Sequence, residues 1–77
     1  MKELIGQKVC AVNFVNQGIG HVEWICTGTL IRVQEHMICI KVESIARDLQ
    51  EVGLKDGKTK ETWFNTRADT FSRMFPI

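Results

Sequence analysis

Three cysteines and two histidines are among the residues of this 77-residue chain whose side chains could act as nucleophile, base or metal ligand. A thiolate nucleophile needs an imidazole within hydrogen-bond reach. His21 precedes Cys26 by five residues in a strand-like stretch, which places the two about 17 Å apart in an extended chain. His36 and Cys39 are closer, but no carboxylate stands at a spacing that would orient the imidazole. The sequence therefore predicts a protein that is not an enzyme.

The spacing of the cysteines also argues against a metal site. Positions 10, 26 and 39 provide no Cys-x₂-Cys pair, and His21 and His36 are too far apart for the His pair of a zinc site. Their odd number does not fit the disulfide framework of a small secreted domain. Each cysteine stands among apolar residues, as in Ile38-Cys39-Ile40. We expect three reduced thiols that pack as small core residues, with no metal and no cofactor.

Strand-like stretches account for most of the chain. Enrichment in β-branched and aromatic residues, or alternation of apolar and polar residues, predicts strands over residues 8–15, 21–34, 37–43 and 61–65. Residues 16–20, Asn-Gln-Gly-Ile-Gly, predict a turn. Their two glycines lack the third glycine and the helix of a phosphate-binding loop. Gly28 predicts a bulge or a sharp bend inside the second strand.

Residues 44–58 fit two structures and are expected to leave the core as an exposed excursion. Ser44 could cap a short helix that ends at Gly53. Alternatively, residues 51–62 could form a hairpin, because the Asp56-Gly57 step suits a tight turn. The two structures are compatible if the helix ends at Val52.

The C-terminal stretch also has two interpretations. Residues 66–69, Thr-Arg-Ala-Asp, predict a single turn. After this turn the chain could form a last strand, or a short helix, since Phe71, Met74 and Phe75 also have helical spacing.

The size and the apolar pattern together predict self-association. A single domain, residues 1–77, of 8.8 kDa has a small core, which stabilises a fold by only a few kcal/mol. Residues 9–12, Val-Cys-Ala-Val, are apolar on both sides of their strand. Trp24-Ile25 and Trp63-Phe64 repeat this pattern, and adjacent residues of a strand point to opposite faces. We expect part of the second face to be covered by a second subunit or a ligand.

Five short strands with a bent second strand, and a one-turn break before the last strand, resemble the plan of small SH3-like barrels. Residues 28–37, Gly-Thr-Leu-Ile-Arg-Val-Gln-Glu-His-Met, are also similar to the first motif of Sm-like RNA-binding proteins. In that motif a glycine bends the second strand and a His-Met pair often stands in the turn into the third. The resemblance implies a mainly β fold, a small five-stranded SH3-like or Sm-like barrel, able to associate edge to edge into a ring.

The family's RNA site is not carried over to this chain. Gln34 stands where the Sm-like motif has Asp, and Ile38 stands where it has Asn. The Arg-Gly step of the family's second motif is absent, and residues 65–67, Asn-Thr-Arg, do not replace it.

The candidate binding residues are aromatic residues of the second and fourth predicted strands and two polar residues that follow the second aromatic pair. We predict a non-enzymatic binding module, a homo-oligomer that binds a protein partner or a small anionic ligand. The rings would provide buried area, and Asn65 and Arg67 would provide oriented polar contacts. The candidate residues are Trp24, Trp63, Phe64, Asn65 and Arg67.

Nucleic-acid binding is the alternative function. Lys55, Lys58 and Lys60 form a small basic edge beside Trp63 and Phe64, whose rings could stack on bases. Acidic residues are interleaved with these lysines, and the net charge of the chain is only +1, far from a typical basic footprint.

The start of the chain lacks the features of an export signal. No apolar segment follows the first residues. The unbroken apolar run of residues 9–12 is too short to cross a membrane. We expect a cytoplasmic protein with no membrane partner. Such a short chain is also compatible with an origin in a phage or another mobile element.

Overall fold

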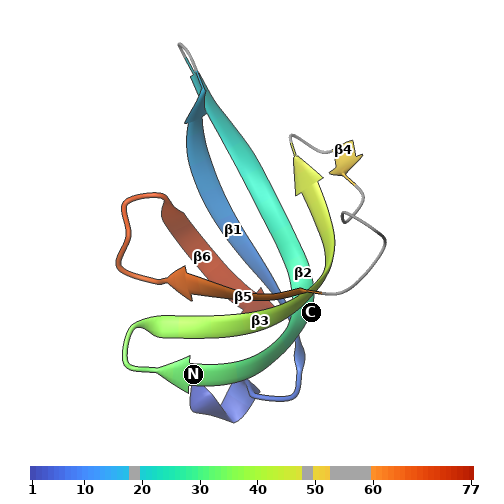
Figure 1. Cartoon of the computed structure of the whole chain (residues 1–77), viewed down its shortest axis with the longest axis vertical. Coiled ribbons are helices and arrows are strands. Elements are labelled where there is room, and N and C mark those ends of the chain that lie inside the picture. The colour runs from blue at the N-terminus through green and yellow to red at the C-terminus, as the bar shows by residue number, and fades with distance from the viewer. Residues whose placement is uncertain (18–19, 48–49, 53–59) are drawn as a thin grey trace.

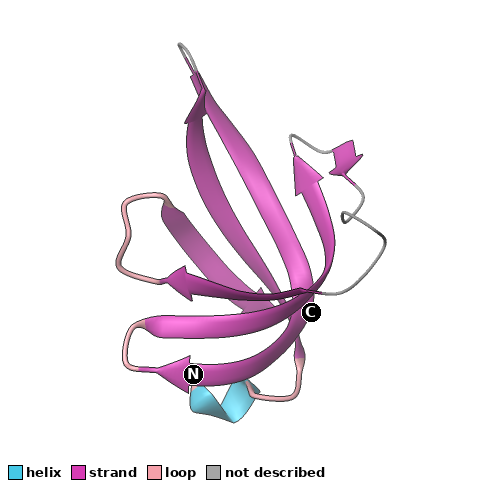
Figure 2. Ribbon diagram, viewed as in Figure 1, coloured by secondary structure: helices cyan, strands magenta, loops and turns pink. Residues whose placement is uncertain are grey.

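A computed structural model describes residues 1–17, 20–47, 50–52 and 60–77 (Figure 1). Strands predominate (Figure 2), so the predicted mainly β class is confirmed. The described elements are the 3-10 helix η1 (Lys2–Leu4) and the strands β1 (Lys8–Gln17), β2 (Gly20–Gln34), β3 (Met37–Arg47), β4 (Gln50–Val52), β5 (Lys60–Asn65) and β6 (Phe71–Pro76).

The strands form one antiparallel sheet. Its order is β4-β3-β2-β1-β6, and β5 pairs with β3. β2 occupies one edge of β3 along its whole length, so β4 and β5 follow each other along the other edge. Within the described residues no pairing joins β5 to β6, and each of these strands therefore has one open edge.

The sheet bends where Gly28 of β2 passes β3. The β2–β3 register shifts between Thr27 and Gly28 and again between Leu30 and Arg32. A Cβ atom on Gly28 would overlap with the backbone carbonyl oxygen of Lys41, so only glycine allows this close approach. The predicted bulge is confirmed, and Figure 1 shows β2 and β3 curving together.

The inner face of this curve carries the hydrophobic core. Its members alternate along β1, β2 and β3 with residues of the opposite, outer face. Leu4 of η1, Phe64 of β5, and Phe71 and Met74 of β6 pack against the core. The core cluster consists of Val9, Ala11, Cys26, Leu30, Ile38, Ile40 and Val42.

The helix predicted from Ser44 onward is wrong. Residues 44–47 continue β3, and residues 50–52 form β4. Ile45 packs against the core and pairs with Cys26 on one side and Val52 on the other. Pairing with β2 on one side and β4 on the other keeps residues 45–47 in an extended strand, although their sequence also fits a helix. The Asp56-Gly57 turn lies outside the described residues.

The last segment is a strand, so the helical alternative for residues 71–75 is wrong. The register between β1 and β6 shifts so that Val12 faces Arg73 while Asn13 faces Phe71. Ser72 is the extra residue, and it places both Phe71 and Met74 on the inner face. A bulge thus produces a spacing of three that imitates a helix.

The N-terminal segment closes one end of the core. The Gly6 N–H donates to the Leu30 carbonyl oxygen at 2.7 Å, and the Leu30 N–H donates to that of Gln7 at 3.1 Å. These bonds hold Leu4 of η1 against the core. In the described parts of the chain, no helix has the length and apolar character needed to span a membrane.

Candidate functional site

β5 places two adjacent aromatic residues on opposite faces of the sheet. Phe64 pairs with Ile38 of β3 and packs against the core. Trp63 pairs with Cys39 on the outer face, and 42% of its surface is exposed. Only Trp63 is therefore available to a ligand.

Trp63 stands at the end of a row of residues that crosses three strands. Arg32 of β2 pairs with Cys39 of β3, and Cys39 pairs with Trp63. Arg32 is exposed, whereas Cys39 between the two is completely buried. Since neighbouring strands are about 4.8 Å apart, the backbone positions of Arg32 and Trp63 are separated by about 10 Å. This row combines an accessible ring with a positive charge.

The next row on the same face carries opposite charges. Lys41 of β3 pairs with Glu61 of β5, and both residues are exposed. Opposite charges at facing positions of neighbouring strands offset each other. Among the described residues, Arg32 differs from Lys41 because it pairs with Cys39 and not with an acidic residue.

Asn65 and Arg67 belong to the turn that follows β5. The Arg67 N–H donates to Asn65 Oδ1 at 2.9 Å, a local bond typical of Asn in turns. Thr66 fastens this turn to the β2–β3 turn, because its N–H and its hydroxyl donate to the His36 carbonyl oxygen at 2.8 and 2.7 Å. Asn65 and Arg67 are exposed, and among the described residues Arg67 forms no ion pair.

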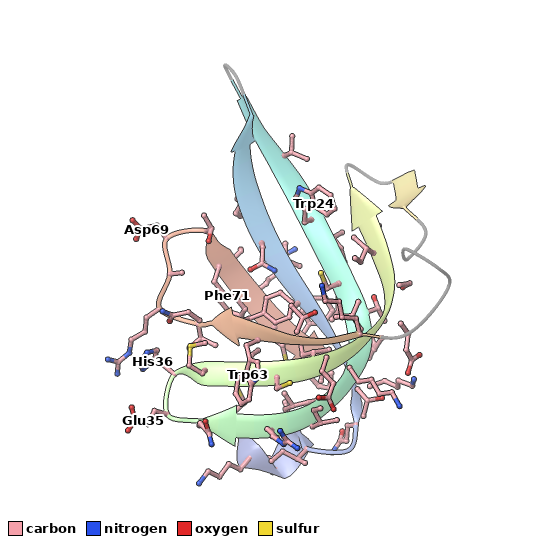
Figure 3. All side chains as sticks on the ribbon, in the orientation of Figure 1. Trp24, Glu35, His36, Trp63, Asp69 and Phe71 are labelled. Carbon is pink, nitrogen blue, oxygen red and sulfur yellow. The ribbon has the colours of Figure 1, made fainter. Side chains whose placement is uncertain are left out.

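Trp24 lies apart from these residues. It pairs with Asn13 and Arg47, is half-buried, and shares the inner face with Cys26. Figure 3 shows Trp24 on the upper part of β2 and Trp63 on the lower part of the sheet. Trp63 and Asn65 therefore share the outer face of β5, Arg67 lies in the turn that follows, and Trp24 and Phe64 lie on the other face.

The three cysteines are buried and free. Cys10, Cys26 and Cys39 are 7%, 8% and 0% exposed and form no disulfide. Burial raises the pKa of all three thiols above the ordinary value, and the Glu61 carboxylate adds to this effect at Cys39. The thiols are therefore protonated at neutral pH, which is unfavourable for nucleophilic attack. In the described part of the chain, no three His, Cys, Asp or Glu side chains gather where they could hold a metal ion.

The alternation pattern alone does not place Arg32 beside Trp63. The register shift between Leu30 and Arg32 decides which face the arginine occupies, and a bulge cannot be located from alternation. Comparisons with known protein families, with curated proteins and with solved structures find no match to this chain. Its function is therefore inferred from the geometry of the sheet.

Proposed function

We propose that this chain is a non-enzymatic binding module that forms a homo-oligomer and binds a small anionic ligand or a protein partner on the outer face of β5. The exposure of Trp63 carries this proposal. A tryptophan that is 42% exposed on an edge strand leaves a large ring in water. Trp is among the residues that contribute most to binding when a partner covers it.

The residues around Trp63 favour an anionic group in the ligand. Arg67 lies in the turn beyond it, and Arg32 lies in the same row. A guanidinium group binds carboxylate or phosphate with two parallel hydrogen bonds. Asn65 follows Trp63 at the next outer position of β5, about 7 Å away, where its amide could orient the ligand.

We also propose that the sheet belongs to a small SH3-like or Sm-like barrel. Support comes from the order β6-β1-β2-β3-β5, from the bend at Gly28 and from the single turn between β5 and β6. In such a barrel β5 and β6 are edge strands whose unpaired backbone groups can accept another strand. The free thiols support a location in the reducing cytoplasm.

Single-stranded nucleic acid is the second candidate ligand. A base could stack on Trp63, and Arg32 and Lys41 are exposed on the same face. Glu61 faces Lys41 and reduces the positive field there. Of the three lysines of the predicted basic edge, Lys60 is described, and Lys55 and Lys58 lie outside the described residues.

Fluorescence titration tests the proposal with three probes: adenosine monophosphate, a hexaglutamate peptide and a short oligothymidylate. In a Trp24→Phe background, the signal reports on Trp63. We expect one of the first two probes to bind, with affinity about tenfold weaker after Arg67→Ala. Trp63→Phe, which keeps a ring, should bind better than Trp63→Ala.

The probes also separate the candidate functions. Binding of oligothymidylate alone, with a steep salt dependence, would favour the nucleic-acid alternative. No change in fluorescence with any of the three probes would contradict binding at Trp63.

A further inference from the structure

The outer face of β1 and its neighbours carries a second apolar surface, distant from Trp63 in register. Cys10 pairs with Phe75 of β6, and Val12 pairs with Ile25 of β2. The sheet continues this surface to Ala46 of β3 on one side and to Phe14 along β1. We name this surface the outer apolar patch, and its residues are Cys10, Val12, Phe14, Ile25, Ala46 and Phe75.

The outer apolar patch lies on β1 and on the strands that pair with it. Among the described elements, β1 makes its main contacts with β2 and β6, which are its neighbours in the sheet. Val12 and Cys10 are only 1% and 7% exposed. Phe75 is 38% exposed, and Phe14 and Ile25 are half-buried. The accessible apolar area therefore belongs mainly to Phe75, with smaller parts from Phe14 and Ile25.

Opposite charges stand on two sides of the outer apolar patch. Arg73 of β6 pairs with Val12, and its guanidinium carbon lies 6.0 Å from the centre of the Phe75 ring. Glu23 of β2 pairs with Phe14, one row further along β1. Arg73 and Glu23 are both close enough to Cys10 to act on the pKa of its thiol, in opposite directions.

We infer that a second copy of this chain packs its own outer apolar patch against this one, as a face-to-face dimer. A two-fold axis along β1 places β6 of one copy over β2 of the other. Arg73 then lies near Glu23 of the second copy, and the same contact forms twice because the interface is symmetric. This inference rests on the self-association in the proposed function and assigns a surface to it.

The available area sets the strength of this dimer. The accessible part of the outer apolar patch is small, because Val12 and Cys10 are 1% and 7% exposed and Phe75 is 38% exposed. It is smaller than the area of about 800 Å² that each partner contributes to a standard interface. The dimer should therefore dissociate in the micromolar range.

Charge reversal at Arg73 and Glu23 tests the inference by sedimentation equilibrium from about 1 to 200 μM protein. Arg73→Glu and Glu23→Arg each place like charges together in the dimer, and each should weaken it by about tenfold or more. The double variant R73E/E23R restores opposite charges and should return the dissociation constant to within about threefold of wild type. Circular dichroism establishes that each variant is folded.

Two further variants keep the test decisive if Glu23→Arg does not fold. Phe75→Ser removes the exposed ring of the outer apolar patch and should weaken the dimer by about tenfold. Lys2→Glu is the matched control, a charge reversal at an exposed residue of η1 outside this surface, and it should leave association unchanged.

The outcomes distinguish this inference from the proposed function. A wild-type protein that associates equally well after Arg73→Glu and Phe75→Ser would overturn the inference, while self-association would stand through another surface. A wild-type protein that stays at 8.8 kDa over the whole range would overturn both. Ligand binding at Trp63 is measured separately by the fluorescence titration.

Discussion

The inner and outer faces of the sheet are built from the same strands but differ in composition and in solvent exposure. On the inner face, Leu30, Ile38 and Ile40 are completely buried by the curve of the sheet and by the side chains packed against it. On the outer face, the β1 region is apolar and the β3–β5 region combines charges with Trp63. One position along β5, from Phe64 to Trp63, thus changes a ring that packs against the core into one that is exposed.

Substitutions on the two faces are expected to change different properties of the protein. The inner face carries the core, so its substitutions should act on the free energy of unfolding. Substitutions of the exposed residues of the outer face, such as Trp63 and Phe75, should act on association or ligand binding. Five predictions follow, from the largest expected effect to the smallest.

Gly28→Ala should be the most damaging single change. The new Cβ atom would overlap with the Lys41 backbone, and the bend that closes the inner face would be lost. We expect a loss of at least about 3 kcal/mol in unfolding free energy, measured by urea denaturation. Gly20→Ala is the control, because a Cβ atom there meets nothing within 4 Å. Equal effects of the two substitutions would contradict the role of the bend.

Phe64→Ala and Trp63→Ala compare the two faces at adjacent positions. Phe64 packs against the core, whereas Trp63 is 42% exposed. Phe64→Ala should lower the unfolding free energy by about 2 kcal/mol or more, and Trp63→Ala by less than about 1 kcal/mol. The ligand affinity should show the opposite order. A larger loss of stability from Trp63→Ala would show that this ring belongs to the core.

The thiols provide a third comparison between the faces. Cys39 lies on the outer face beside Trp63, and Cys26 lies in the core. Trp63→Ala should expose Cys39 and speed its alkylation by iodoacetamide about tenfold, while Cys26 stays slow; peptide mass spectrometry measures both rates. Unchanged rates at Cys39 would show that other side chains cover it.

The pH dependence of the unfolding free energy is expected to follow from the same three thiols. Burial raises the folded-state pKa of Cys10, Cys26 and Cys39, so the folded state holds these protons more tightly than the unfolded state. Their contribution to stability is complete below the unfolded value of about 8.5 and is lost as the pH rises through the folded values. Cys26→Ala should reduce this loss above pH 8.5.

Glu35→Gly should give the smallest effect, a gain. Glu35 has a φ of 53° in the two-residue turn between β2 and β3. This left-handed conformation strains a side chain, and glycine accepts it. We expect an increase of about 0.5–1 kcal/mol in unfolding free energy, whereas Glu35→Ala, which keeps the strain, should give none. Because Glu35 lies in the turn, outside both proposed surfaces, ligand binding and association should remain unchanged.

Local signals in the sequence predict most of the strands. β-branched enrichment located β1 and β2, and Gly28 located the bend. The extension of β3 beyond residue 43 was not predictable, because pairing with β2 and β4 decides it. The bulge at Ser72 was also hidden, since Phe71 and Met74 have the spacing of a helix.

The candidate site was predictable only in part. Alternation separates Trp63 from Phe64, but it does not say which of the two faces inward. That choice depends on the pairing of Phe64 with Ile38 in the core. The faces on which Arg32 and Arg73 lie depend on strand registers that contain bulges. Long-range pairing, rather than composition, therefore defines these surfaces.

The mass of the protein in solution, measured against concentration, tests the central claim most directly. If a second copy completes the outer face, the weight-average mass should rise from 8.8 kDa at low micromolar concentration toward twice that value above the dissociation constant. A mass that stays at 8.8 kDa at every concentration up to about 200 μM would contradict the claim.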